Sequence, residues 1–139
     1  MVKAEFATQM NHQAPMEPEA CVSYLEGEGE DAQLVVVGRN IDIHQHMTNL
    51  QEALGWENVC YREAYSGGQF GIKAAMTSEG IAAAAALHFK RPVRYIPSLA
   101  ESMLLTNKRH PYTMKVKLGA DEDGKLTAFN IDYTVDNGA

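Results

Sequence analysis

A glycine-rich segment, residues 66–73, constrains the fold most strongly, because it separates a strand-like run from a helix-forming run. Upstream, residues 58–65 read as extended chain, and downstream, residues 74–87 are almost all small or apolar. Glycines at such a junction allow positive φ and let backbone N–H groups approach a ligand closely. A helix that starts directly afterwards adds unpaired N–H groups that favour an anion or an oxo group. The segment therefore predicts either a tight turn or a ligand-binding loop between strand and helix.

Composition is that of one globular domain. The chain has 139 residues, an apolar fraction of 45% and a charged fraction of 22%, which suits a single domain spanning residues 1–139. A net charge of −6 argues against a nucleic-acid partner. The sequence has neither an apolar run long enough to span a membrane nor an apolar signal core, so we expect a cytoplasmic location. Cys21 and Cys60 match no zinc spacing and are expected to be reduced thiols in strands.

The order of elements predicts an α+β fold with a mixed or antiparallel sheet and two main helices. Strand-like runs lie at residues 3–8, 20–25, 33–37, 58–65, 112–118 and 126–133. Helices are expected from Asp42 as N-cap to Leu54, over residues 74–87, and from a Ser98 cap to Leu105. The β-branched run 33–37 indicates burial on both faces. The alternating last two runs predict a hairpin with one wet face and one buried face.

Four polar side chains invite a functional interpretation that their spacing does not favour. His44 and His46 are two apart on a predicted helix and point to different sides, so a solvated or polar face is favoured over metal binding. Glu17 and Glu19 could serve as a carboxylate pair for acid–base work. Because i and i+2 residues on a strand merely share a face, surface or domain-contact roles are favoured.

Four motifs in sequence order carry a family resemblance. They are residues 12–19, the loop 67–71, the Arg-Pro-Val-Arg run 91–94, and the Asn-Lys-Arg-His-Pro run 107–111. Together they resemble the molybdenum-binding large subunit of the xanthine dehydrogenase and aldehyde oxidase family, with a pattern closest to the aldehyde oxidoreductases. The resemblance covers nearly the whole chain. The chain ends as a strand leads into a glycine turn, so we expect a segment of a larger molybdopterin-binding subunit.

The resemblance implies part of a molybdenum hydroxylase, an oxidoreductase that oxidises an aldehyde or an N-heterocycle with water-derived oxygen. The implied cofactor is a molybdenum-pyranopterin, either molybdopterin or its cytosine dinucleotide. The implied partners are the remainder of the large subunit, iron–sulfur clusters and often FAD on other domains or subunits, and a small-molecule substrate. The base glutamate is expected outside this chain, so this chain by itself is expected to be inactive.

The same resemblance places the loop at the metal without making it a direct metal ligand. Its implied cofactor-binding residues are Gly67, Gly68, Gln69, Phe70 and Gly71. Phe70 and Gly71 would offer backbone N–H groups to the oxygen ligands of the metal, while Gly67 and Gly68 would allow close approach. The Phe70 ring would either line the substrate channel or pack in the core.

Two positions depart from the family pattern. Purine-oxidising members carry a glutamate after the lysine of the loop, and Ala74 here favours aldehydes over purines. Many members place a glutamine before the first long helix, where this chain has Arg39. We expect Arg39 to be a solvated charge at a strand end.

A second function class stays open beside the enzyme. The chain could be a truncated, non-catalytic binding or interaction module of the same fold, holding a ligand or partner at the same loop. The intact motifs favour the enzyme.

Overall fold

The computed structural model describes residues 1–137, which form two compact units. One unit comprises Met1–His12 and the chain from Lys108 onward, and the other comprises Gln13–Asn107. The predicted α+β class is confirmed, with the strands divided between two sheets. None of the helices among the described residues is long and apolar enough to cross a membrane.

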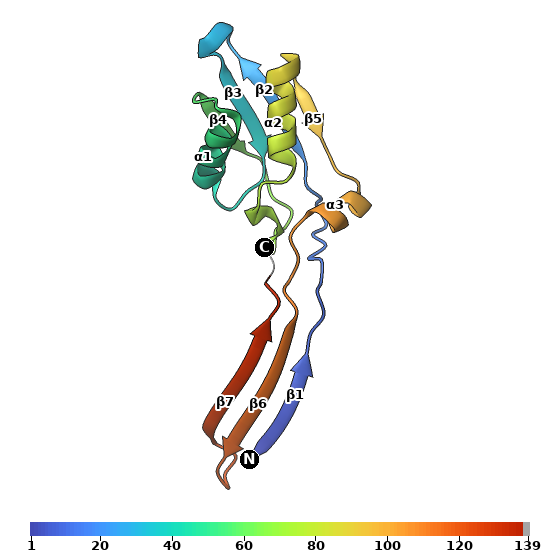
Figure 1. Ribbon diagram of the computed structural model, residues 1–139, viewed down its shortest axis with the longest axis vertical. Helices are drawn as coiled ribbons and strands as arrows, with labels where there is room; N and C mark the ends of the chain where they lie inside the picture. Colours follow the sequence, from blue (N-terminus) through green and yellow to red (C-terminus); the bar gives the residue numbers. More distant parts are fainter. Residues whose placement is uncertain (138–139) are drawn as a thin grey trace. The chain divides into compact units, whose positions relative to one another are not determined.

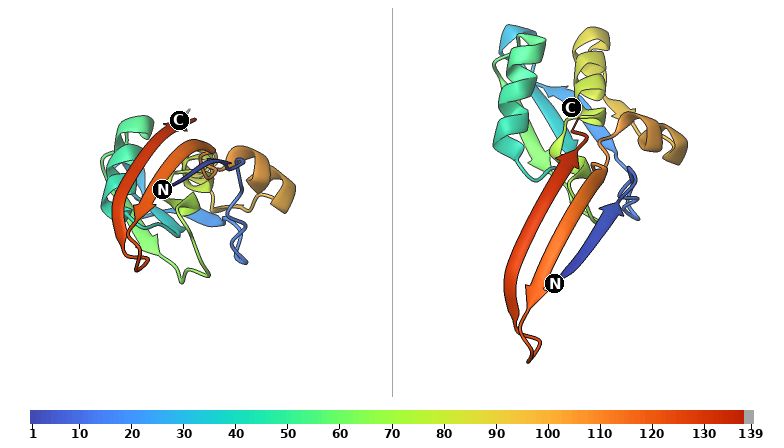
Figure 2. Two further views of the ribbon diagram at one scale, coloured as in Figure 1. Left: turned by 90° about the horizontal axis from the view of Figure 1, so that it is seen from below. Right: turned by 60° about the horizontal axis from the view of Figure 1, so that its bottom comes forward.

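The unit Gln13–Asn107 is built on a four-stranded mixed sheet of order β4-β3-β2-β5 (Figure 1). Its strands are β2 (Cys21–Glu26), β3 (Gln33–Gly38), β4 (Val59–Glu63) and β5 (Val93–Tyr95). Its helices are α1 (Ile43–Leu54), α2 (Ser78–Phe89) and α3 (Leu99–Leu105), with short 3₁₀ turns η1 (Gly29–Asp31) and η2 (Ile72–Ala74). Strand β3 pairs antiparallel with β2 and parallel with β4, while α1 and α2 lie side by side against the sheet (Figure 2).

Local signals account for where most of these elements begin and end. The Asp42 side chain accepts a hydrogen bond from the Gln45 N–H at 3.1 Å, and Gly55 ends α1 with φ +61°. Helix α1 connects β3 to β4, which fits the long crossover that parallel strands require. At α3, Ser98 and Glu101 form the reciprocal hydrogen bonds of a capping box. The predicted starts and ends of α1 and α3 are confirmed.

Small side chains let α2 lie deep against the sheet. Ala82, Ala83 and Ala86 are fully buried and pack in one cluster with Leu34 and Val36 of β3. Because alanine adds little bulk, the helix backbone approaches the strands closely. Both faces of β3 are covered, as predicted, since neighbouring Val35 and Val36 have no exposed surface.

The other unit is a three-stranded antiparallel sheet of order β1-β6-β7. Its strands are β1 (Val2–Ala7), β6 (Tyr112–Ala120) and β7 (Leu126–Val135). The predicted hairpin is confirmed, but the predicted buried face is wrong for the described residues. Phe129 is 64% exposed and Tyr133 is 57% exposed, because this unit consists of strands without a helix to cover them.

Cys21 yields a prediction about thiol chemistry. Its side chain is buried in the core, and burial, assisted by the charge of Glu79, raises the pKa of the thiol from 9.0 to about 12. We expect a thiol reagent at pH 8.5 to spare Cys21 in the folded chain and to modify it after unfolding, as read by mass spectrometry of peptides.

The same shift gives a pH dependence with a definite sign. The unfolded thiol ionises near its ordinary pKa of 9.0, whereas the folded thiol stays protonated to about 12. Its contribution to the free energy of unfolding is therefore complete below pH 9 and is lost between pH 9 and 12. The stability difference between the wild type and Cys21→Ala should narrow over that range. A difference that widens would contradict the assignment.

Candidate functional site

Three chain segments meet at one edge of the four-stranded sheet. The glycine loop follows the carboxyl end of β4, and Arg39 and Asn40 follow the carboxyl end of the parallel neighbour β3. Strand β2 runs antiparallel to β3, so the segment that precedes β2, residues 13–20, reaches the same edge. The carboxyl edge of parallel strands is a common position for binding sites in such sheets.

The glycine loop curls through three residues with positive φ. These values are +105° at Gly68, +47° at Phe70 and +90° at Gly71. A left-handed conformation costs little for glycine but is uncommon for phenylalanine, so the loop holds Phe70 in a sparsely populated conformation. The Phe70 ring is 60% exposed. Packing in the core of this unit is therefore not its role, and lining a substrate channel stays a prediction.

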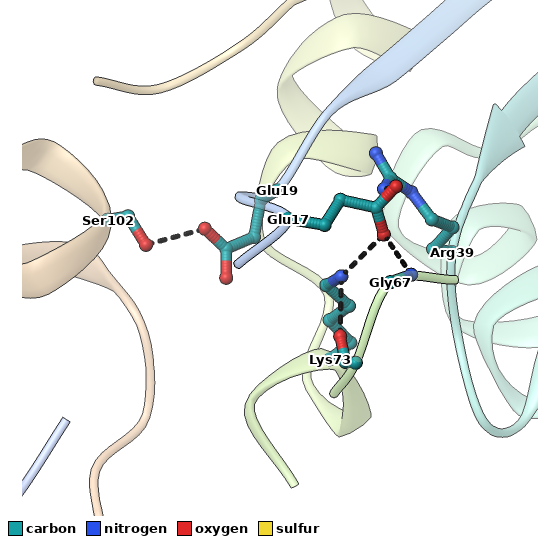
Figure 3. Close-up of polar contacts among 7 residues, drawn as sticks. Glu17, Glu19, Arg39, Gly67, Lys73 and Ser102 are labelled. Atoms are coloured by element: carbon teal, nitrogen blue, oxygen red, sulfur yellow. Dashed lines mark hydrogen bonds and ion pairs between the residues drawn. The ribbon is translucent and has the colours of Figure 1, made fainter. Parts of the chain in front are cut away.

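The carboxylate of Glu17 holds the start of the loop (Figure 3). Glu17 Oε2 accepts a hydrogen bond from the Gly67 N–H at 2.6 Å and one from Lys73 Nζ at 3.1 Å. The same ammonium donates to the Gly68 carbonyl oxygen at 2.8 Å. The Lys73 side chain is only 3% exposed, and burial together with the neighbouring Arg39 charge lowers its pKa. The buried lysine is thus paired both to Glu17 and to the loop backbone.

The space available for a side chain differs among the three loop glycines. A Cβ at Gly67 would lie 2.8 Å from Glu17 Cβ, closer than carbon atoms can approach without displacement. A Cβ at Gly68 would lie 3.1 Å from the Phe70 ring. A Cβ at Gly71 would meet nothing within 4 Å, so only the backbone conformation calls for glycine there. Gly71 therefore borders open space.

Arg39 is buried rather than solvated, which corrects the expectation for this residue. Its side chain is 10% exposed and forms an ion pair with Glu17, and burial lowers the pKa of the guanidinium. The reason is that the chain leaves β3 at the edge where Glu17 supplies a counter-charge. Glu17 therefore faces two cations, Arg39 and Lys73, and the loop rests on this cluster.

Glu19 is also buried, so a surface role is wrong for it. The residue is 4% exposed, and Glu19 Oε2 accepts a hydrogen bond from the Ser102 hydroxyl of α3 at 2.6 Å (Figure 3). A cavity of about 10 Å³, the size of one water molecule, is lined by Glu19, Arg39, Lys73 and Glu79 together with Ala20, Ala75 and Thr77. The two glutamates two residues apart thus face different partners and do not form a catalytic pair in this structure.

The helix expected directly after the loop begins later than predicted. Residues Ile72–Ala74 form a 3₁₀ turn, Ala75 is extended, and α2 starts at Ser78. Burial of Ile72 and Lys73 turns the chain back toward the core before the helix begins. The first N–H groups of α2 are therefore separated from the loop by the η2 turn and do not directly continue it. Any oxo or anionic group at the loop is met by the loop's own amides.

The Gln69 side chain occupies one of the loop amides, that of Gly71. The Gly71 N–H donates to the Gln69 side-chain oxygen at 2.9 Å, so a ligand that used this amide would displace that oxygen. The loop is bordered by an open hollow of about 320 Å³, lined by Asn40, Ile41, Ile43, Glu63, Ser66, Gln69 and Lys73. A hollow of this size beside exposed loop backbone has room for a cofactor or a small substrate.

His46 contacts the η2 turn that follows the loop, a role that sequence reasoning missed. It is 2% exposed, which contradicts a solvated face, and His46 Nε2 lies 3.1 Å from the Ala74 carbonyl oxygen. The Asn40 side-chain amide lies 2.7 Å from the same ring nitrogen. Its position four residues before the buried Leu50 was an available signal for an inward-facing residue.

Known proteins resemble this chain over most of its length. A family model described as "Molybdopterin cofactor-binding domain" matches residues 1–139. The aldehyde oxidoreductase of Megalodesulfovibrio gigas is 31% identical over 139 residues, which is 99% of this chain and 15% of that protein. The nicotinate dehydrogenase large molybdopterin subunit of Eubacterium barkeri is 36% identical over 126 residues, which is 89% of this chain and 29% of that subunit.

Solved structures give the same result. The aldehyde oxidoreductase structure from Desulfovibrio gigas superposes with a TM-score of 0.82 at 29% identity, covering 96% of this chain and 15% of that one. The chain belongs to the molybdopterin cofactor-binding domain family, and the resemblance drawn from its four motifs is confirmed. It spans well under a third of the length of these relatives.

The crowding at Gly67 gives a stability prediction. We expect Gly67→Ala to lower the free energy of unfolding by about 1–3 kcal/mol, because the new methyl group would displace Glu17. Urea unfolding followed by circular dichroism measures the change.

Gly80→Ala is the matched control. Gly80 lies within α2, and its nearest neighbour to an added Cβ is the Met76 side chain at 3.8 Å, an ordinary contact. Alanine there should stabilise the chain by roughly 0.5–1 kcal/mol through helix propensity. Equal effects of the two substitutions would show that the Gly67 contact is not restrictive.

Proposed function

We propose that the chain is part of a molybdenum hydroxylase that oxidises an aldehyde or an N-heterocycle with water-derived oxygen, with loop 67–71 lying at the metal. The observation that carries the proposal is the loop itself. Its exposed backbone has positive φ at Gly68, Phe70 and Gly71 and borders an open hollow, in a chain that the molybdopterin family model matches throughout. When bound, the molybdenum-pyranopterin supplies the two-electron redox chemistry and the activated oxygen.

The contribution of this chain is to bind and orient. The amides of Phe70 and Gly71 are proposed donors to oxygen atoms of the cofactor, and Gly67, Gly68 and Gln69 shape the turn that presents them. Preorganised N–H donors stabilise charge on an oxygen without reorganisation during the reaction. The cations Arg39 and Lys73 lie behind the loop, and Glu17 offsets part of their charge.

The proposed substrate preference rests on the residue that follows Lys73 in the sequence. Ala74 offers no carboxylate at the position where purine-oxidising members carry a glutamate, which supports aldehydes over purines. One relative is named an aldehyde oxidoreductase and another a nicotinate dehydrogenase subunit, so an aldehyde or an N-heterocycle is the proposed substrate class.

The remaining chemistry is assigned to partners. The base glutamate, the rest of the large subunit, the iron–sulfur clusters and a flavin are proposed to lie on other segments, domains or subunits, in the cytoplasm. Residues 1–139 are proposed to act as one domain within that subunit, in line with the single family match over that range. On this view the chain alone is inactive.

The decisive measurement is the molybdenum and pterin content of the 139-residue chain after co-expression with the cofactor-making enzymes. We expect a folded chain that self-associates and holds no stoichiometric molybdenum, because part of the cofactor-binding surface lies elsewhere. Stoichiometric molybdenum would contradict the split site. A compact monomer without molybdenum would favour the non-catalytic binding module.

Turnover in the complete enzyme tests the loop directly. Gly71→Val should reduce kcat by at least about a hundredfold, the scale of losing one oxyanion donor, since a branched side chain at φ +90° distorts the loop where a ligand approaches. Gly68→Val should act in the same direction, because its added bulk meets the Phe70 ring.

Gly29→Val provides the control. Gly29 has φ +75° and open space around an added Cβ, so it carries similar backbone strain in the η1 turn, away from the loop. Its kcat should stay near that of the wild type. Normal turnover in both Gly68→Val and Gly71→Val would remove the loop from the site.

A further inference from the structure

The geometry points to Glu17 as the positioning residue that sets the conformation of loop 67–71 before any cofactor binds. We propose that its carboxylate, held between the cations Lys73 and Arg39, fixes the Gly67 amide and thereby the direction of the loop. The cofactor part of this inference rests on the proposed function. The loop-positioning part stands on the chain alone.

The first step is that Glu17 binds the loop at its backbone. Its Oε2 accepts from the Gly67 N–H at 2.6 Å, a short charge-assisted hydrogen bond. Backbone hydrogen bonds to a carboxylate fix the orientation of the peptide plane, and the peptide plane of Gly67 sets where the chain goes next. Glu17 therefore acts on the path of the loop.

The second step is that Lys73 binds both Glu17 and the loop backbone. Its ammonium contacts both Glu17 Oε2, at 3.1 Å, and the Gly68 carbonyl oxygen, at 2.8 Å. One buried cation thus links the carboxylate to a second peptide group of the loop. The peptide that carries the Gly67 N–H and the peptide that carries the Gly68 C=O are both held by the Glu17–Lys73 ion pair.

The third step is that Gly67 leaves room for the Glu17 side chain beside the loop backbone. An added Cβ at Gly67 would lie 2.8 Å from Glu17 Cβ and 3.3 Å from its carboxyl carbon. At Gly71, by contrast, the corresponding space is open. The Glu17 side chain therefore leaves no room for a side chain at residue 67. The open space at Gly71 lies where the proposed cofactor would approach.

The fourth step is that Glu17 itself is anchored. Arg39 pairs with its other oxygen, Oε1, and the neighbouring Pro15 is buried, with its Cβ 3.7 Å from the position of a Cβ on Gly68. A carboxylate paired with two cations is restricted in where it can move. Such a group is suited to preorganising a loop, because its own position does not depend on the ligand.

The test is a comparison of amide exchange in the full 139-residue chain, labelled with ¹⁵N. In Glu17→Ala we expect hydrogen exchange of the Gly67 amide with water to accelerate by roughly tenfold or more, since the carboxylate hydrogen bond is lost. In Glu17→Gln, which keeps an acceptor but not the charge, we expect an intermediate rate. Amides of α1 should be unchanged in both, which shows that the fold is retained.

Glu26→Gln is the matched control. Glu26 pairs with Arg62 at 2.9 Å on the exposed side of the same sheet, so its substitution removes an ion pair of like type away from the loop. It should leave the Gly67 exchange rate within about twofold of the wild type. Should Glu17→Ala fail to fold because Lys73 is left unpaired, the double variant Glu17→Ala with Lys73→Met removes both charges and should show the same fast Gly67 exchange.

An unchanged Gly67 exchange rate in a folded Glu17→Ala chain would overturn the inference. A separate measurement, the molybdenum content of the complete enzyme, tests the link to the cofactor. Fast Gly67 exchange with a normal molybdenum content in Glu17→Ala would limit Glu17 to the loop and overturn its role toward the cofactor. Absence of molybdenum from the wild-type enzyme would instead contradict the proposed function, and the exchange result would stand independently.

Discussion

The rest of the site depends on how the charge of Lys73 is accommodated. A lysine that is 3% exposed is expensive to bury unless its ammonium is paired and hydrogen-bonded. Glu17 and the Gly68 carbonyl supply both needs. Removing Glu17 would leave the buried ammonium without its paired carboxylate. The segment before β2 and the glycine loop are therefore bound to each other by a pair whose members lie 56 residues apart.

The mixed sheet brings these partners together. Strands β3 and β4 run parallel, so Arg39 and the glycine loop, which follow them, emerge at one edge. Strand β2 runs the opposite way and starts at that edge, so Glu17 and Glu19 arrive there from the other direction. One strand direction reversed relative to its neighbours is enough to gather two cations, two carboxylates and the glycine loop at this edge.

Elements governed by neighbouring residues could be predicted from the sequence. Asp42 and Gly55 bound α1, and Ser98 with Glu101 starts α3, because caps are satisfied within a few residues. The start of α2 could not, since it depends on the burial of Ile72 and Lys73 against distant segments. The burial of Glu19 could not be predicted either, since its hydrogen-bond partner, the Ser102 hydroxyl, is 83 residues away in the sequence.

The alternation of strands and helices, the order of the family motifs and the glycines that permit positive φ at residues 68 and 71 follow from the amino-acid sequence. These depend on local conformation, side-chain period and composition. Long-range packing sets what fills the space beside each glycine: the Glu17 side chain at Gly67, and open space at Gly71. It also decided that Arg39 and His46 are buried. Such contacts join residues far apart in the chain, and no local pattern encodes which charge will meet which loop.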